Sequence, residues 1–328
     1  MKNGFAPGLL AASLALSAMS SPAASLRGDA VRVHGTDYVG LADWSRVKGL
    51  KWRWLKRDES FQLTNATVRF QFAVDSREAR FNGLQLWLLF PLATRNGEIL
   101  ISRLDADNTL RPLLAPPRNG PDKKIKTICL DPGHGGKDSG NRVASKQEKD
   151  FTLRLAFELR DQLRKAGFQV YLTRSGDTFV ELFDRNAVAR SRNADLFVSL
   201  HFNATDGGRN EAKGAEVYAL TPAGASSTNA RGEGKGGWAT GNKFNANNLL
   251  LACQIQKSLV RNLEVEDRGV RRARFAVLRD AAMPAVLIEA GFMSHPTEGK
   301  KIFDAAYRRE MARAIVDGIG SYKRIVER

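Results

Sequence analysis

The chain has 328 residues, of which 43% are hydrophobic and 26% are charged. These proportions are typical of a soluble globular protein and name no activity, and the length suits two ordinary domains or one large one. The formal net charge of +16 indicates an anionic partner: nucleic acid, a membrane surface or an acidic cell-wall polymer.

The N-terminus has the layout of a secretory signal peptide. Lys2 is followed by an uncharged Ala/Leu-rich run, Leu9 to Met19, and then by small residues. The run is too short to span a bilayer, and no later segment approaches that length. We therefore expect residues 1–24 to be a signal peptide and the protein to be exported, to the periplasm, the cell wall or the extracellular space, without stable membrane insertion.

Residues 29–114 are expected to form a small strand-rich α+β domain. Apolar and polar residues alternate in Val31–His34 and Val68–Val74, and Leu84–Phe90 is a denser apolar stretch. No cluster of His, Cys or acidic residues lies here, so we expect no catalytic site in this domain. Residues 115–124, which are rich in Pro and Gly, predict a linker.

From residue 125 to 325, strands and helices alternate, which predicts an α/β domain with a largely parallel sheet flanked by helices. The expected strands are 126–130, 169–173, 196–200, 215–220, 275–278 and 285–288. The expected helices are 151–163, 182–189, 247–262 and 311–319. A Gly/Ser/Asn-rich stretch, 223–242, is expected to be mobile.

The sequence does not decide whether the two cysteines, Cys129 and Cys253, form a disulfide. An exported pair is able to do so, but both lie in apolar contexts that suit a small buried thiol.

Polar residues follow three of the predicted strands. His134 lies in Asp131–Gly136 after the first, His201 follows the third, and Glu289 follows the last. Because the carboxyl ends of strands in an open α/β sheet meet at one crevice, we expect these three side chains to converge. Two imidazoles and a carboxylate are a frequent donor set for zinc, with a fourth position left to water.

The same segments resemble, in the same order, the zinc-dependent N-acetylmuramoyl-L-alanine amidases. The matching blocks are LDPGHGGKDSG, EKDFTLRLAFELRDQLRKAGFQVYLTR, LFDRNAVARSRNADLFVSLHFNA and FAVLRDAAMPAVLIEAGFMSHP, and together they cover about Lys126 to Tyr322. The resemblance implies Zn²⁺ bound by His134, Glu148 and His201, with Glu289 as the essential second acid. The residues alone do not separate the two acids, because Glu148, just before a helix, also suits a helix N-terminus.

The activity implied by the resemblance is hydrolysis of the amide bond between the lactyl group of N-acetylmuramic acid and L-alanine of the stem peptide. Glu289 would accept a proton from water and return one to the leaving amine. Peptidoglycan would then be the partner, and nucleic acid would not. Asn203 and Arg279 are candidates for substrate binding, although Asn203 also suits a turn and Arg279, like Arg185, also suits pairing with carboxylates. The need for an activator protein or another cell-wall partner stays open.

The N-terminal segment weakly resembles the small N-terminal modules related to that of copper amine oxidases. The matching features are Gly35–Val39, Asn82–Gly83 and the closing Leu110–Leu114. This resemblance implies only a scaffolding or substrate-positioning role.

Two alternatives remain at this point. One is another zinc peptidoglycan hydrolase, a peptidase or a deacetylase, and the other is a non-catalytic cell-wall binding protein. Some members of the amidase family carry a helical insertion that supplies an extra acid to the zinc. Here that region is the Gly-rich stretch, with Glu233 as its only acid, so we expect no such plug.

Overall fold

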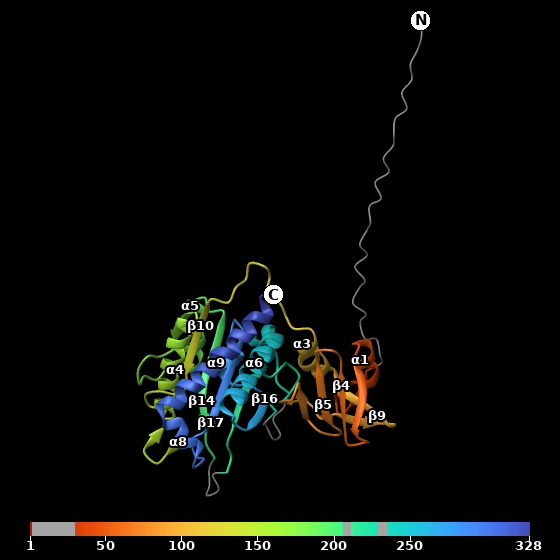
Figure 1. The fold of residues 1–328 in the computed structure, drawn as a ribbon, viewed down its shortest axis with the longest axis horizontal. Helices are drawn as coiled ribbons and strands as arrows, with labels where there is room; N and C mark the ends of the chain where they lie inside the picture. The colour runs from red at the N-terminus through yellow and green to blue at the C-terminus, as the bar shows by residue number, and fades with distance from the viewer. Residues whose placement is uncertain (2–29, 206–210, 229–234) are drawn as a thin grey trace.

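The computed structural model describes Met1 and residues 30–205, 211–228 and 235–328 (Figure 1). Apart from Met1, the expected signal peptide, residues 1–24, lies outside the described residues. So does Glu233 in the Gly-rich stretch. Within the described residues, no helix is both long enough and apolar enough to cross a membrane.

A twisted sheet forms the centre of the C-terminal part of the chain. In spatial order its strands are β13 (Gln169–Leu172), β10 (Thr127–Pro132), β14 (Leu196–Asn203), β17 (Ala285–Phe292), β15 (Ala215–Leu220) and β16 (Asp267–Ala273). The first four are mutually parallel. β15 is antiparallel to β17, and β16 is parallel to β15. The expectation of a largely parallel sheet is thus only partly met, since the sheet is mixed.

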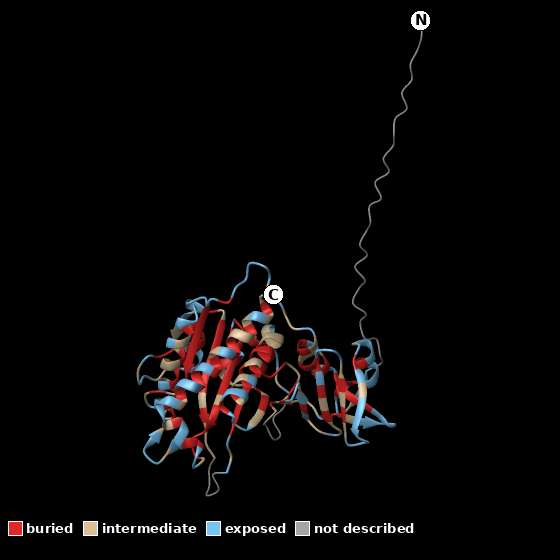
Figure 2. Cartoon of the chain, in the orientation of Figure 1, coloured by how far each residue is buried: buried red, intermediate tan, exposed pale blue. Residues whose placement is uncertain are grey.

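Helices cover both faces of this sheet, which is why its strands are buried (Figure 2). On one face lie α4 (Glu148–Lys165), α6 (Asn245–Leu263) and α9 (Ala305–Val326), which pack on one another. On the other lie α5 (Leu182–Ser191), α7 (Ala276–Arg279) and the 3₁₀ segment η2 (Thr240–Phe244). The apolar spacing predicted for α4 buries Phe151, Leu155, Leu159 and Leu163 against the sheet.

One predicted strand was wrong. Residues 275–278 belong mainly to the short helix α7. The strand of this region is β16, which begins at Asp267, eight residues before the predicted strand. An apolar run of four residues is too short for periodicity to separate a strand from a helical turn. The charges of Arg268, Arg271 and Arg272 also hid β16, because arginine is uncommon in a covered strand.

The N-terminal region is strand-rich, as predicted. Its elements are β1 (Val31–Val33), β2 (Thr36–Gly40), α1 (Leu41–Val47), β3 (Lys51–Lys56), β4 (Ser60–Thr64), β5 (Arg69–Ala73), β6 (Glu78–Phe81), β7 (Leu84–Trp87), β8 (Ala93–Arg95), β9 (Glu98–Ser102), α2 (Arg103–Asp105), the π-helical segment η1 (Ala106–Leu110) and α3 (Arg111–Leu114). Strands β3 to β7 form an antiparallel meander. Residues 115–126, which follow, contain no helix or strand.

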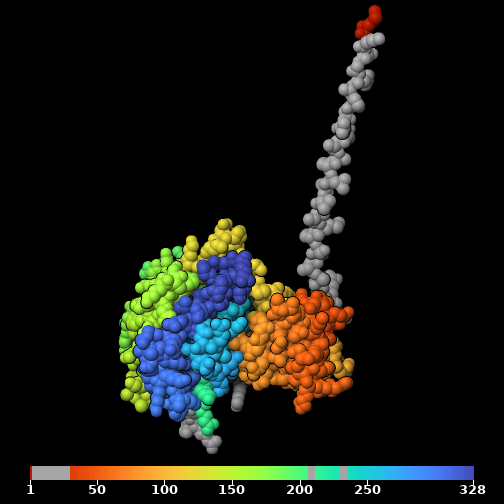
Figure 3. Space-filling view, in the orientation of Figure 1, coloured from red at the N-terminus to blue at the C-terminus, as the bar shows by residue number. Residues whose placement is uncertain are grey.

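The sequence did not predict that the two regions share one sheet. β7 pairs in parallel with β16, so the meander continues the sheet of the C-terminal part, and the two regions abut in Figure 3. The Asp267 carboxylate accepts hydrogen bonds from the Gln85 backbone N–H at 2.7 Å and from Gln256 Nε2 at 2.8 Å. The buried Arg272 donates to the Asn108 carbonyl oxygen at 2.8 Å from the other side of the junction.

The remaining described elements complete the C-terminal part. They are the hairpin of β11 (Arg142–Val143) and β12 (Lys146–Gln147), and the helix α8 (Glu298–Phe303). Cys129 and Cys253 are both buried and free, so they are not bridged. Burial raises the pKa of the Cys253 thiol to about 12, so this thiol stays protonated and unreactive near neutral pH.

The junction predicts a measurable contribution of Asp267 to stability. Asp267→Ala leaves the Gln85 N–H and the Gln256 amide without their acceptor and should lower the free energy of unfolding by about 1–3 kcal/mol. Urea denaturation checks this value. The matched control is Asp43→Ala, because Asp43 pairs only with the exposed Arg46; it should cost less than about 1 kcal/mol. Equal stabilities of the two variants would contradict the role of Asp267.

Candidate metal centre

His134 lies in a tight loop directly after β10. It has a φ of 62°, a left-handed conformation that is uncommon for a residue other than glycine. Buried arginines hold this loop by its carbonyl groups: Arg185 donates to the His134 carbonyl oxygen at 3.0 Å, and Arg174 donates to that of Gly133 at 2.8 Å. Arg185 also pairs with the buried Asp131 of β10 at 2.8 Å, so it connects the His134 loop to this strand.

Glu148 is the first residue of α4 and is almost fully buried. Its carboxylate does not cap its own helix. It accepts hydrogen bonds from the backbone N–H of Asn141 at 2.9 Å and of Phe202 at 3.0 Å, which fixes both oxygens. The remaining lone pairs point to the two histidines, so the helix-capping interpretation of Glu148 does not hold.

His201 is on β14, one residue past the backbone that pairs with the end of β10. A Cβ built on Gly133 would lie 2.3 Å from Cε1 of the His201 ring. Only glycine therefore leaves room for the imidazole at this point. This is the physical requirement behind the glycine that precedes His134.

The three predicted ligands converge. One potential ligand atom from each of His134, Glu148 and His201 lies within 4.8 Å of the others. Among the described residues, these three form the cluster of His, Cys, Asp or Glu side chains that could hold a metal ion. Glu148 Oε2 lies 3.1 Å from His134 Nε2, and Glu148 Oε1 lies 3.0 Å from His201 Nδ1. Asp138 Oδ2 contacts His134 Nδ1 at 2.8 Å, which leaves Nε2 of His134 facing the centre.

The electrostatics of this group favour bound positive charge. Burial alone would raise the pKa of Glu148, but hydrogen bonds and charges from His134 and His201 outweigh it and hold that pKa well below its usual range. Burial alone would lower the pKa of His134, but Glu148 and Asp138 outweigh it and raise that pKa. A cation bound between His134, Glu148 and His201 would replace the imidazole protons that now lie between the histidines and the Glu148 carboxylate.

Glu289 lies on the next strand, β17, directly opposite His201 in the pairing register. Paired residues of neighbouring strands project to the same face of a sheet, so Glu289 faces the same space as His201. Its Oε2 atom is buried and has no hydrogen-bond partner among the described residues. Burial, followed by the charges of Glu148 and Glu216, raises the pKa of Glu289 well above its ordinary value.

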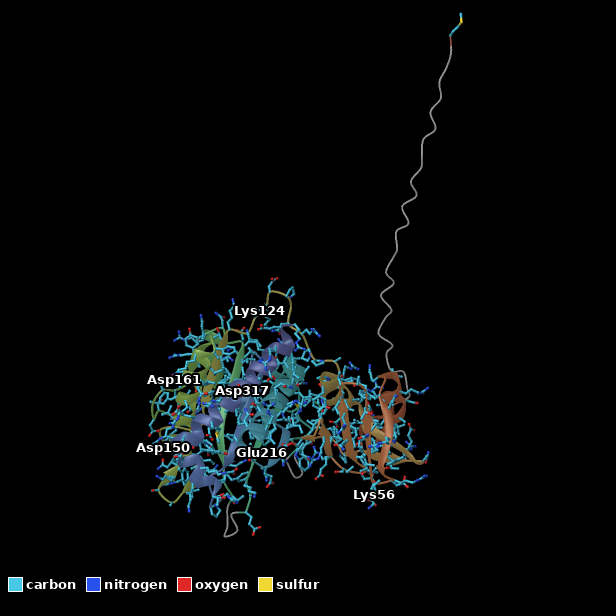
Figure 4. The ribbon with its side chains drawn as sticks, viewed as in Figure 1. Lys56, Lys124, Asp150, Asp161, Glu216 and Asp317 are labelled. Atoms are coloured by element: carbon cyan, nitrogen blue, oxygen red, sulfur yellow. The ribbon has the colours of Figure 1, made fainter. Side chains whose placement is uncertain are left out.

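Sequence reasoning missed Glu216. It is on β15, opposite Glu289 in the register, so the row across three strands reads His201, Glu289, Glu216. In Figure 4 it is labelled near the lower end of the catalytic sheet, towards the N-terminal region. The available signal was a lone acid in the otherwise apolar strand AEVYAL, in which every residue is buried.

The two candidate substrate-binding residues lie in different surroundings. Asn203, at the end of β14, donates from Nδ2 to Glu216 Oε1 at 3.0 Å and therefore borders the row. Arg279 is exposed on α7, which packs on α5, β15, β17 and η2. The structure thus joins Asn203 to the row through Glu216 and gives no contact between the Arg279 side chain and the row.

The fold and the centre define a class of protein: an α/β protein whose two-histidine, one-carboxylate donor set and adjacent acid are typical of metal-dependent hydrolases. Comparison with known proteins identifies the family. The N-acetylmuramoyl-L-alanine amidase family matches residues 128–321, more than half of the chain, so the chain belongs to this family and is an amidase of this class. The resemblance found in the sequence is confirmed to that extent.

Individual relatives agree with this assignment. The N-acetylmuramoyl-L-alanine amidase AmiA of Escherichia coli is 36% identical over 223 residues, covering 60% of this chain and 76% of AmiA. LytC of Bacillus subtilis is 37% identical over 199 residues, covering 61% of this chain but only 36% of LytC. The crystal structure of an N-acetylmuramoyl-L-alanine amidase from Clostridium difficile superposes with a TM-score of 0.51 at 34% identity, covering 61% of this chain and 97% of that one.

The packing of His201 against Gly133 predicts that a single methyl group disrupts the centre. Gly133→Ala should push the His201 ring aside and weaken Zn²⁺ binding by at least about tenfold, as measured by competition with a chromogenic chelator. Gly176→Ala is the control, because a Cβ there meets nothing within 4 Å. Unchanged affinity in Gly133→Ala would show that the ring is not a ligand in this position.

Proposed function

We propose that this chain is an exported, zinc-dependent amidase that separates the stem peptide from N-acetylmuramic acid in peptidoglycan. The observation that carries the proposal is the convergence of His134, Glu148 and His201 with Glu289 on the neighbouring strand. The family supports the amide bond as the target.

The donor set supports zinc as the metal. Two imidazole nitrogens and one carboxylate suit this borderline-soft ion, whereas magnesium and calcium prefer oxygen donors alone. We propose that His134 Nε2, a Glu148 oxygen and His201 Nδ1 hold the ion, with Asp138 orienting His134. When bound, zinc supplies Lewis-acid chemistry that polarises a carbonyl and acidifies water.

Glu289 is the proposed proton carrier. Burial and the charges of Glu148 and Glu216 raise its pKa, so it binds a proton more strongly than an ordinary glutamate, and its buried Oε2 has no hydrogen-bond partner among the described residues. In the proposed reaction Glu289 accepts a proton from the attacking water. It then donates a proton to the amine of L-alanine as the amide bond breaks.

The remaining proposed roles concern substrate binding and the organisation of the chain. Asn203 is assigned to substrate binding because it bonds to Glu216, which lies opposite Glu289, and Arg279 because its position matches the family block. Residues 1–24 are assigned as the signal peptide, 29–114 as an N-terminal scaffolding domain of the type found in copper amine oxidases, 115–124 as a linker and 125–325 as the catalytic domain. The positive net charge suits the acidic polymers of a bacterial wall.

The products of digestion test the proposed function against its alternatives. Purified sacculi incubated with the zinc-loaded protein should release stem peptides that carry a free L-alanine amine, together with intact glycan strands. Glu289→Gln should lower kcat by about a thousandfold or more while one zinc ion stays bound per chain. Free acetate would indicate a deacetylase, and peptides cut between amino acids would indicate a peptidase. Full biological effect in Glu289→Gln would indicate a binding protein.

Zinc affinity should depend on pH through His134. The pKa of His134 is higher in the folded protein than its ordinary value of 6.5. Protonation of His134 therefore stabilises the metal-free fold. This stabilisation is complete at pH values below 6.5 and is lost as the pH rises through the raised pKa. Zinc requires the neutral imidazole, so its affinity should fall about tenfold per pH unit below the pKa of His134.

Zinc titrations between about pH 8 and about pH 5.5 measure this dependence. Asp138→Asn removes one of the groups that raise the pKa of His134, so the fall should begin at a lower pH in this variant. The same affinity throughout this range would contradict His134 as a ligand.

A further inference from the structure

Glu216 is a buried carboxylate that the proposed proton transfer does not use. Its Oε1 accepts hydrogen bonds from Asn203 Nδ2 at 3.0 Å and from the Tyr218 hydroxyl at 2.8 Å. Its Oε2 lies 2.7 Å from Arg271 Nε and 3.4 Å from Arg268 Nε. Three hydrogen-bond donors, Asn203, Tyr218 and Arg268, and the ion pair with Arg271 thus hold one carboxylate from three strands. This is the arrangement expected of a group whose position matters.

This cluster spans the strand that carries Glu289. Strand β17 lies between β14 and β15, so the hydrogen bond from Asn203 to Glu216 crosses the strand that carries Glu289. Glu289 is opposite Glu216 in the register, and its Oε2 is unpaired. Arg268 and Arg271 of β16 both pair with Glu216.

The two arginines are held in turn by the N-terminal region. Both lie on β16, which pairs with β7 of that region. Trp87, the last residue of β7, donates from Nε1 to the Arg268 carbonyl oxygen at 3.0 Å. The Arg271 guanidinium lies over the Trp87 ring, 4.6 Å from its centroid. Trp87 therefore contacts the backbone of one arginine and the side chain of the other.

We infer that the N-terminal region completes the catalytic site through Trp87, which positions Arg271 on Glu216, and that Glu216 in turn positions Asn203 across the strand that carries Glu289. Trp87 and Glu216 are thus positioning residues, and the inference rests on the proposed role of Glu289. The family match begins at residue 128, so Trp87 lies outside it. The N-terminal region acts as part of the catalytic unit rather than as a separate wall-binding module.

Steady-state kinetics of the full-length mature protein on a soluble muropeptide test this inference. Glu216→Gln should lower kcat by about tenfold to a hundredfold, with a KM within about threefold of the parent and one zinc ion per chain. Trp87→Leu should lower kcat by about fivefold to twentyfold in the same way. Trp87→Phe keeps a ring under Arg271 and should retain at least about half of the parent kcat.

Trp54→Leu is the matched control. Trp54 is a partly exposed tryptophan of the same region. It lies on β3, which is an edge strand of the shared sheet and is separated from β7 by β4, β5 and β6. Its replacement should therefore leave kcat unchanged. Circular dichroism and Tm verify folding, and if Trp87→Leu does not fold, Glu216→Gln and Trp87→Phe decide the outcome.

Two results would overturn the inference while leaving the proposed function intact, provided that Glu289→Gln is inactive. One is a kcat within about twofold of the parent in both Glu216→Gln and Trp87→Leu. The other is a raised KM at unchanged kcat in Trp87→Leu, which would show that the N-terminal region only binds substrate. Absence of zinc-dependent amide cleavage in the parent protein would instead refute the proposed function.

Discussion

The carboxylate of Glu148 joins three segments that are far apart in the sequence. It contacts His134 in the loop after β10 and His201 at the end of β14, while it begins α4 itself. A carboxylate this deeply buried is tolerated only because every lone pair meets a donor, including two backbone N–H groups. The centre is therefore pre-formed: the histidines, the loop and the helix are already in place around one point, and a metal needs little reorganisation to bind.

The continuous sheet extends this constraint to the N-terminal region. In a protein with a flexibly attached module, the last strand of the catalytic sheet would be an exposed edge. Here β7 covers that edge, and Asp267 and Trp87 bond across the junction. The same strand, β16, carries the arginines that pair with Glu216 beside Glu289. The strand that forms the junction therefore also supplies the arginines that contact the row of His201, Glu289 and Glu216.

Three reactive residues of the candidate site could be predicted from the sequence because they lie at or near the ends of strands. His134, His201 and Glu289 each follow an apolar run, and the carboxyl ends of parallel strands meet at one edge whatever the details of packing. Glu148 needed the family resemblance, because an acid at a helix start has an ordinary electrostatic explanation. The amphipathic period of α4 and the alternation in the N-terminal strands were likewise local signals, and both elements formed as expected.

Tertiary structure alone decided which strands are neighbours and in which direction they run. Alternation in a strand shows which face is covered, but the partner and the direction depend on contacts between distant residues. For this reason the sequence did not predict that β15 runs antiparallel to β17, that β7 joins β16, or that Glu216 lies opposite Glu289. The sequence by itself determined the reactive groups and the strand ends that carry them. The pairing of the strands decided which acid stands next to which, because side chains on neighbouring strands meet only in one register.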